Sequence, residues 1–244
     1  MATLKTKARI ILSSLLGKSF TSISIPNTPI ISFDVFDTLI IRPGISIPSD
    51  VFDMLNPEDK NFKTRRIEAE KRARAESGEE DITLEEIYKV LMPTAPDEEL
   101  KQAMEREIEA ELKVCRANPD ALDFFNQVRE SGKCIIIISD MYLNSHTIRT
   151  ILTHCGYDIS SVPVYVSSEY AKTKRTGSLF KTVLSLESVE SGEVLHIGDN
   201  LRSDVIRPKL VAPQDIIHIG DNLRSDWFRP KLMGMKAILI RTRH

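Results

Sequence analysis

The sequence is poor in cysteine, has little excess charge and lacks a long uncharged apolar run, and each absence excludes a class of protein. Its three cysteines, Cys115, Cys134 and Cys155, form no C-x-x-C pair. We therefore expect reduced thiols and neither a disulfide framework nor a zinc site. A net charge of -2 supplies no basic stripe of the kind that binds nucleic acid. Nucleic acid is not expected among the partners.

The amino-terminal segment begins with basic residues and continues into an apolar run, Ile10–Gly17. That run is shorter than the roughly 20 residues that span a bilayer, and no A-x-A-like cleavage site follows it. A helix covering the domain, or a weak contact with a membrane surface, fits the segment better than a secretory signal. We expect cytoplasmic localisation and no stable membrane insertion.

Five apolar stretches rich in β-branched residues predict the strands of a sheet. They are the start of Ile30–Ile41, then Cys134–Ile138, Val162–Val166, Val194–Ile197 and, as an edge strand, Ala237–Arg241. A continuous apolar run indicates burial on both faces, as in a parallel sheet. Helical patterns over Pro119–Glu130, His146–His154 and Thr176–Leu186 alternate with the strands. The order predicts an α/β fold with a doubly wound parallel sheet.

Residues 44–118 contain no convincing strand and predict an inserted block of helices. One begins near Ser49 and a charged one covers Asn61–Ser77; in the next, Leu84–Leu91, Thr83 and Glu86 form a capping box. The longest helix opens at Pro96 and carries an apolar stripe every four residues: Leu100, Met104, Ile108 and Leu112. We interpret the many charges on these helices as solvated faces.

The carboxyl-terminal part contains a duplication. Residues 196–210 return as residues 218–232, and only Val205-Ile206 differs from Trp227-Phe228. A single repeat is too short for a solenoid, so we interpret it as a tandem duplication of one strand–loop–helix unit in which one copy is redundant.

Polar residues follow four of the predicted strands or their loops in a fixed order. Asp34 and Thr38 come after the first strand, Ser139-Asp140 after the second, Lys174 with Phe180 after the third, and Gly198-Asp199 with Asp204 after the fourth. Open α/β sheets keep their chemistry at the carboxyl ends of the strands. This ordered set resembles the haloacid dehalogenase-like hydrolase superfamily. The resemblance implies a Rossmann-like core, residues 1–43 and 119–244, with a helical cap, residues 44–118.

The resemblance also implies a role for each residue. Asp34 matches the nucleophile, Ser139 the hydroxyl that binds the transferred phosphoryl group, and Lys174, rather than the nearby Lys172, the lysine. Thr38 and Asp140 are expected to contact the substrate. The implied ligands of a Mg²⁺ ion are Asp34, the backbone carbonyl of Phe36, Asp199 and Asp204, with Asp221 and Asp226 as the alternative from the second copy.

Elementary chemistry is consistent with these roles. A carboxylate that attacks a phosphate monoester is repelled by it, so positive charge must lie between them. Mg²⁺ prefers oxygen ligands and keeps several waters, so two or three carboxylates suffice, and a lysine adds further charge. Attack by Asp34 would form an aspartyl-phosphate that water hydrolyses. A Mg²⁺-dependent phosphatase for a small phosphorylated substrate is therefore expected.

One position departs from the family pattern. Phosphatases of the superfamily carry a second aspartate two residues after the nucleophile as general acid and base, whereas this chain has Phe36 and then Asp37. Because neighbouring positions on a strand point to opposite faces, Asp37 is not expected to replace that acid. The hypothesis is a slow phosphatase, or one whose leaving group needs little protonation.

Two other functions stay open on the sequence alone. An aromatic residue at position 36 resembles the metal-independent carbon–halogen hydrolases of the superfamily, although the Gly-Asp…Asp motif argues against them. A non-catalytic or regulatory module is the other alternative. The strings FDVFDTL and SDMYL resemble a subgroup of predicted hydrolases encoded with surface-polysaccharide enzymes, which favours a sugar phosphate as substrate. The sequence does not indicate an oligomeric state.

Overall fold

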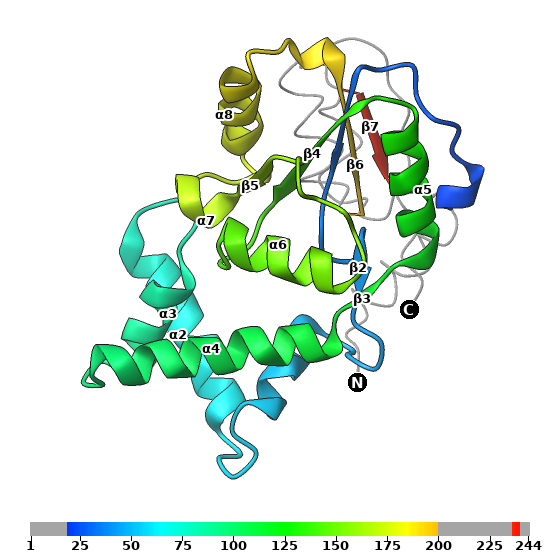
Figure 1. Ribbon diagram of the computed structural model, residues 1–244. Helices are drawn as coiled ribbons and strands as arrows, with labels where there is room; N and C mark the ends of the chain where they lie inside the picture. The colour runs from blue at the N-terminus through cyan, green and yellow to red at the C-terminus, as the bar shows by residue number, and fades with distance from the viewer. Residues whose placement is uncertain (1–18, 200–235, 240–244) are drawn as a thin grey trace, which may run out of the picture.

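The computed structural model describes residues 19–199 and the backbone of residues 236–239. Its centre is a five-stranded sheet with the order β5-β4-β1-β6-β7 (Figure 1). Every neighbouring pair is parallel, which confirms the predicted fold class. The strands are β1 (Ile30–Phe33), β4 (Cys134–Ser139), β5 (Val164–Val166), β6 (Val194–Gly198) and β7 (Lys236–Leu239).

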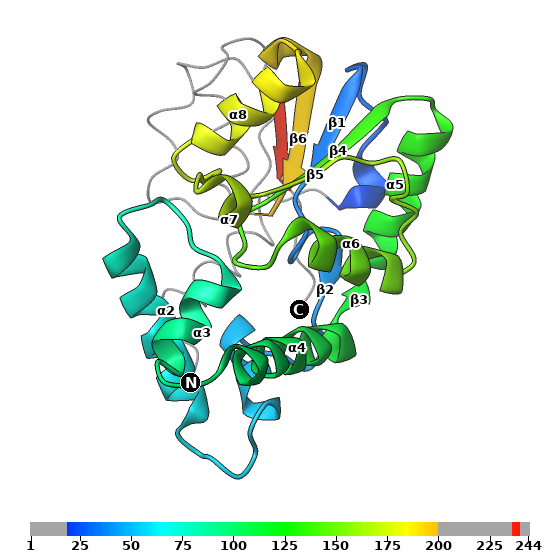
Figure 2. The same cartoon turned by 60° about the vertical axis from the view of Figure 1, so that its left-hand side comes forward.

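Helices cover both faces of the sheet, as a doubly wound fold requires. Helices α5 (Pro119–Glu130) and α6 (Ser145–His154) lie on one side and α8 (Ser178–Glu187) on the other (Figure 2). Phe33 and Ile137 belong to the buried cluster that includes Phe125 of α5, whereas Ile136 belongs to the cluster with Phe180 of α8. Alternate residues of one apolar run therefore serve opposite faces.

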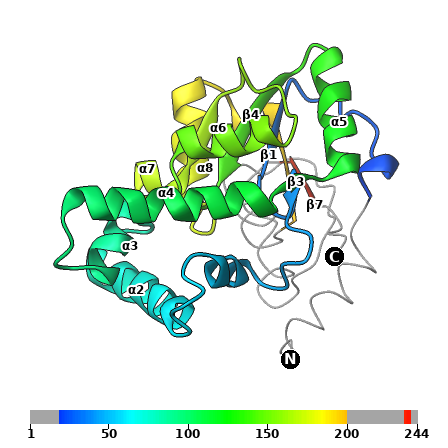
Figure 3. The same cartoon turned by 60° about the horizontal axis from the view of Figure 1, so that its bottom comes forward.

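The inserted helices lie together beside the carboxyl edge of the sheet, and we call residues 44–118 the cap (Figures 1 and 3). Thr83 Oγ1 accepts a hydrogen bond from the Glu86 amide at 3.2 Å, and the Glu86 carboxylate accepts one from the Thr83 amide at 2.7 Å, so the predicted capping box is confirmed. The cap elements are η2 (Pro48–Met54), α2 (Phe62–Ser77), α3 (Leu84–Leu91) and α4 (Asp97–Val114).

The two chain segments that join core and cap pair with each other. Strand β2 (Ile40–Ile41) lies antiparallel to β3 (Arg116–Ala117), and we call this pair the ribbon. The Leu39 carbonyl, just before it, accepts hydrogen bonds from the Asn118 amide at 2.8 Å and the Tyr157 hydroxyl at 2.5 Å. These hydrogen bonds hold the ribbon against the core. The sequence pattern did not predict the ribbon.

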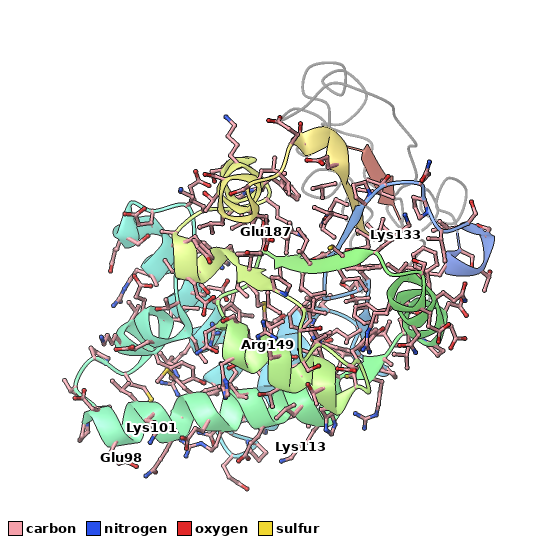
Figure 4. All side chains as sticks on the ribbon, turned by 45° about the horizontal axis from the view of Figure 1, so that its top comes forward. Glu98, Lys101, Lys113, Lys133, Arg149 and Glu187 are labelled. Carbon is pink, nitrogen blue, oxygen red and sulfur yellow. The ribbon has the colours of Figure 1, made fainter. Side chains whose placement is uncertain are left out.

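The interpretation of the cap charges as solvated faces is wrong for part of α2 and α4. Arg66, Glu107 and Glu111 are buried, whereas three residues of the expected apolar stripe (Met104, Ile108, Leu112) are only partly buried. The interpretation holds on the outer side of α4, where the exposed residues Glu98, Lys101 and Lys113 are labelled in Figure 4.

Several expectations fall outside the described residues. The predicted amino-terminal helix lies outside them, and the first described element is the short turn η1 (Phe20–Ser22). Most of the duplication, from residue 200 onward, also lies outside them. Two further short elements, α7 (Ser167–Tyr170) and η3 (Ser191–Glu193), complete the described part. Within that part, no helix combines the length and the apolar character needed to cross a membrane.

Candidate active site

Asp34 directly follows β1, the central strand of the sheet, and its backbone is bound to the neighbouring strand β6. Its amide donates to the Ile197 carbonyl of β6 at 2.9 Å, so the residue continues the ladder of β1. Its side chain is 12% exposed. The nucleophile expected from the sequence therefore lies at the carboxyl edge of the sheet, with its amide bound to β6.

Lys174 forms an ion pair with Asp34. Its Nζ lies 2.8 Å from Asp34 Oδ1, and the lysine side chain is 1% exposed. Burying a charge is unfavourable unless an opposite charge compensates it, and here each group compensates the other. Lys172 instead lies at the surface and donates to the Thr182 hydroxyl at 2.8 Å. Of the two lysines weighed from the sequence, Lys174 is the one beside Asp34.

The loop after β4 supports the lysine from the other side. Ser139 ends β4, two residues beyond the Ile137 that pairs with Phe33 of β1, and it is buried. The next carboxylate, Asp140, accepts hydrogen bonds from the amides of Lys174 at 2.7 Å and Arg175 at 3.3 Å. Asp140 thus organises the lysine loop, and it also lines the cleft described below; its expected contact with substrate stays a prediction.

The first copy of the duplicated motif supplies the strand beside β1. Asp199 follows β6, and its Oδ1 accepts a hydrogen bond from the Thr38 hydroxyl at 3.4 Å. On the far side of β6 the neighbouring strand is β7. The structure thus brings Asp34, Thr38 and Asp199 to one edge of the sheet. The remaining predicted carboxylates, Asp204, Asp221 and Asp226, lie outside the described residues.

Residues 35–38 form a turn and not a continuation of the strand. The Val35 carbonyl accepts from the amides of Leu39 at 2.9 Å and Ile40 at 3.0 Å, and Asp37 adopts a left-handed conformation with φ 59°. Strand alternation therefore does not apply, and Phe36 and Asp37 both line the same cleft. The premise of strand alternation is wrong for these two residues, because β1 ends at Phe33 and the chain has already left the sheet. That Asp37 does not replace the acid stays a prediction.

That cleft has a volume of about 440 Å³ and lies between the core and the cap. Its lining includes Phe36, Asp37 and Asp140 from the core side and Phe52, Ile67, Glu70, Lys71 and Arg74 from the cap. Beside it, Arg42 makes a bidentate contact with Glu111 at 2.9 and 3.2 Å and lies 4.3 Å from the centre of the Phe36 ring. The lining combines charged side chains with aromatic rings, which suits a polar ligand.

Burial changes the ionisation of the pair beside the cleft. Loss of solvent raises the pKa of the Glu111 carboxyl, although the Arg42 guanidinium opposes the change. For Arg42, burial works against the charge, but Glu111 raises the pKa of the guanidinium above its ordinary value. Nothing in the sequence pattern identified these two residues, because they are an isolated arginine after a strand and one of many glutamates on α4.

The donors at the strand ends are oxygens, which is the chemistry that Mg²⁺ prefers. Within residues 19–199, no three or more His, Cys, Asp or Glu side chains are grouped closely enough to hold a metal ion. Asp34 and Asp199 supply two carboxylates on adjacent strands, and the backbone carbonyl of Phe36 follows in the turn. Because Mg²⁺ keeps several waters, these donors fit the ion in kind.

Known proteins resemble this chain in family and in fold. A family model described as haloacid dehalogenase-like hydrolase matches residues 28–206. No curated protein matches the chain. Among solved structures, a 2-haloacid dehalogenase from Pseudomonas syringae pv. Tomato DC3000 is 13% identical with a TM-score of 0.61, covering 88% of this chain and 95% of that one.

Two further structures share the fold. A putative haloacid dehalogenase-like hydrolase from Bacteroides fragilis is 15% identical with a TM-score of 0.50, covering 88% of this chain and 99% of that one. An L-2-haloacid dehalogenase from Xanthobacter autotrophicus is 16% identical with a TM-score of 0.51, covering 75% and 74%. At these identities the likeness shows the fold alone, but the family model spans most of the sequence. The chain belongs to the haloacid dehalogenase-like hydrolase family.

Proposed function

We propose that the chain is a Mg²⁺-dependent phosphatase that hydrolyses a small phosphate monoester, with a sugar phosphate as the favoured class. The observation that carries the proposal is the buried Asp34–Lys174 pair at the strand ends, with Asp199 on the adjacent strand. A carboxylate nucleophile, a fixed cation and a second carboxylate are the groups that phosphoryl transfer to an aspartate needs.

The proposed reaction gives each of these groups a role. An oxygen of Asp34 attacks phosphorus, the bond from phosphorus to the ester oxygen breaks, and an aspartyl-phosphate forms. The Lys174 ammonium lies beside the attacked group and offsets its negative charge, while the Ser139 hydroxyl binds a phosphoryl oxygen. A Mg²⁺ ion held by Asp34, Asp199 and the Phe36 carbonyl would supply further positive charge. Water then attacks phosphorus, releases phosphate and regenerates the carboxylate.

Protonation of the leaving group limits the rate in this proposal. Phe36 stands where the family's phosphatases carry their general acid, and the loss of such an acid slows turnover by about 10²–10⁴-fold. Aryl phosphates, whose leaving groups need little protonation, should therefore be hydrolysed about 10²-fold faster than alkyl phosphates.

The decisive experiment measures phosphate release from 4-nitrophenyl phosphate with Mg²⁺, with glycerol phosphate as the alkyl comparison. Asp34→Asn should reduce the rate by about 10³-fold or more, because the nucleophile is gone. Asp53→Asn is the matched control, since Asp53 is an exposed cap residue paired with Lys63. EDTA should abolish the wild-type rate. A rate that survives in Asp34→Asn refutes the proposal.

A second candidate is carbon–halogen hydrolysis. The aromatic residue Phe36 in the cleft favours it, as do two of the structures above, which are described as haloacid dehalogenases. This reaction predicts halide release from 2-chloropropionate that is unaffected by EDTA. If neither phosphate nor halide is released, a non-catalytic or regulatory module becomes the favoured alternative.

A further inference from the structure

A loop of the cap contacts the core next to the active-site lysine. Glu80 lies between α2 and α3, and one of its carboxylate oxygens accepts hydrogen bonds from the Thr173 amide at 2.9 Å and the Ser178 hydroxyl at 2.6 Å. The hydroxyls of Thr173 and Thr176 also lie within hydrogen-bond distance of that oxygen. A single cap side chain thus meets four donors on the core loop that contains Lys174.

The chemistry of that loop suits a carboxylate. Ser178 begins α8, and the amino end of a helix carries partial positive charge that favours an anion. Partial burial works against the charge of Glu80, but the hydrogen bonds from Ser178, Thr176 and Thr173 lower the pKa of its carboxyl below the ordinary value. The carboxylate is therefore bound as an ion, and charge-assisted hydrogen bonds of this kind are stronger than neutral ones.

The residues next to Glu80 dock the same loop on the core. Asp81 accepts a hydrogen bond from the Ser167 hydroxyl, which itself accepts one from the Met141 amide at 2.8 Å. The Leu84 amide donates to the Tyr142 carbonyl at 2.9 Å. Both Met141 and Tyr142 belong to the loop after β4. Residues 80–84 therefore contact two core loops, the one after β4 and the one that contains Lys174.

The lysine loop is consequently held by two carboxylates of different origin. Asp140, from the core, binds the Lys174 amide at 2.7 Å. Glu80, from the cap, binds the neighbouring Thr173 amide. The Lys174 ammonium lies 2.8 Å from Asp34. Only the Glu80 contact depends on where the cap lies relative to the core.

We infer that Glu80 is a positioning residue by which the cap orders the Lys174 loop and so holds the ammonium against Asp34. The inference rests on the proposed function, in which Lys174 offsets the charge of the phosphoryl group. Without the Glu80 contact, the loop keeps its core-side hydrogen bonds, among them the one from the Lys174 amide to Asp140, but loses the four to the Glu80 carboxylate. The ammonium is then less well placed, so phosphoryl binding depends on a side chain from outside the core.

The test compares Glu80→Gln with Glu79→Gln in the full chain. The Glu79 side chain makes no hydrogen bond or ion pair within residues 19–199, so the control removes the same charge from the same loop. Hydrogen exchange reports the order of residues 173–178 without any need for activity. The inhibition constant for inorganic phosphate reports the placement of the lysine and, unlike a rate, is unaffected by a fraction of unfolded protein.

We expect Glu80→Gln to accelerate exchange in residues 173–178 and to weaken inhibition by phosphate, each by about tenfold, as loss of a charged hydrogen-bond acceptor implies. Glu79→Gln should match the wild type in both. A double-mutant cycle of Glu80→Ala with Ser178→Ala should show non-additive effects on phosphate inhibition.

Two results would overturn the inference. One is unchanged exchange at residues 173–178 in Glu80→Gln; the other is faster exchange with a phosphate inhibition constant equal to that of Glu79→Gln. A wild-type protein without phosphatase activity would instead refute the proposed function, and exchange would still decide whether Glu80 orders the lysine loop.

Discussion

The sheet and the cap differ in what fills their interiors. Between the sheet and α5, Phe33 and Phe125 lie with their ring centres 5.6 Å apart, and Tyr157 contacts Phe125 edge-on at 5.2 Å. In the cap, the corresponding central place is taken by Arg66, which is fully buried and binds Glu107 through two hydrogen bonds of 2.8 and 2.7 Å.

The two interiors are therefore specified in different ways. Apolar burial is non-directional and scales with the area removed from water, so the core is specified mainly by the volume and packing of its apolar side chains. A buried ion pair requires fixed geometry, because each unpaired charge would be strongly unfavourable. Arg66 also lies 4.6 Å from the Phe52 ring and 4.9 Å from the ring of Tyr142 in the core. The charged interior of the cap thus contributes to its alignment with the core.

Removing one member of the cap pair is expected to have the largest effect. Arg66→Met should lower the free energy of unfolding by about 3–5 kcal/mol, because Glu107 would remain buried without its cation. Arg66→Met with Glu107→Leu should recover most of that loss. Urea denaturation measures both, and Arg72→Met on the exposed side of α2 is the control. A double variant no more stable than Arg66→Met would show that the cap interior is not specified by its charges.

The core should instead respond in proportion to the volume removed. Ile137 is fully buried, so Ile137→Ala should lower the free energy of unfolding by about 2–5 kcal/mol and Ile137→Val by about 0.5–1.5 kcal/mol. The same denaturation experiment provides the comparison. Equal losses in the two variants would contradict a core stabilised by apolar packing.

A smaller effect is expected at the start of α3. Thr83→Ala removes the capping hydrogen bond to the Glu86 amide and should lower the free energy of unfolding by about 1 kcal/mol. Thr64→Ala, at an exposed position within α2, is the matched control and should change it by less than about 0.5 kcal/mol. Similar losses at both positions would mean that the capping hydrogen bond of Thr83 contributes nothing to the stability of the fold.

The smallest effect concerns Cys115, at the boundary between cap and core. Burial, with the nearby Glu111 carboxylate, raises the pKa of its thiol to about 12, so the group stays protonated at pH 8. The buried, protonated thiol therefore stabilises the fold at neutral pH. This stabilisation decreases as the pH rises from 9 towards 12, because the thiol of the unfolded chain ionises first. At pH 8, a thiol reagent should modify the exposed Cys134 quickly and Cys115 only after unfolding. Rapid modification of Cys115 in the folded protein would contradict its burial.

The difference between core and cap also explains what the sequence could predict. Runs such as Cys134–Ile138 have one interpretation, because only a strand buried on both faces needs apolar residues throughout. The four motifs follow such strands, so Asp34, Ser139 and Asp199 were placed correctly at the edge of the sheet. Lys174 followed from its spacing to Phe180.

The rest depended on contacts that no local pattern reveals. Arg66 and Glu107 lie 41 residues apart on helices whose charges look alike, and only the fold shows which of them meet. Glu80 lies in a run of charged residues, and no sequence pattern predicts that Thr173 and Ser178 are its partners. The turn at residues 35–38, with its left-handed Asp37, ends the strand alternation that the apolar run Ile30–Ile41 had suggested.

The ribbon has a consequence for how this architecture can be altered. Ile41 and Arg116 face each other across it, so everything from residue 42 to residue 115 leaves and re-enters the core at points about 5 Å apart. Because the pairing holds the two ends close together, a change in the length of the intervening segment alters the closure entropy only slowly. The segment also packs on the core, since Ile82, Ile87 and Tyr88 belong to the same buried cluster as Phe33. We therefore expect a different set of helices between the same two residues to leave the path of the sheet unchanged, provided that it covers the apolar surface which these residues bury.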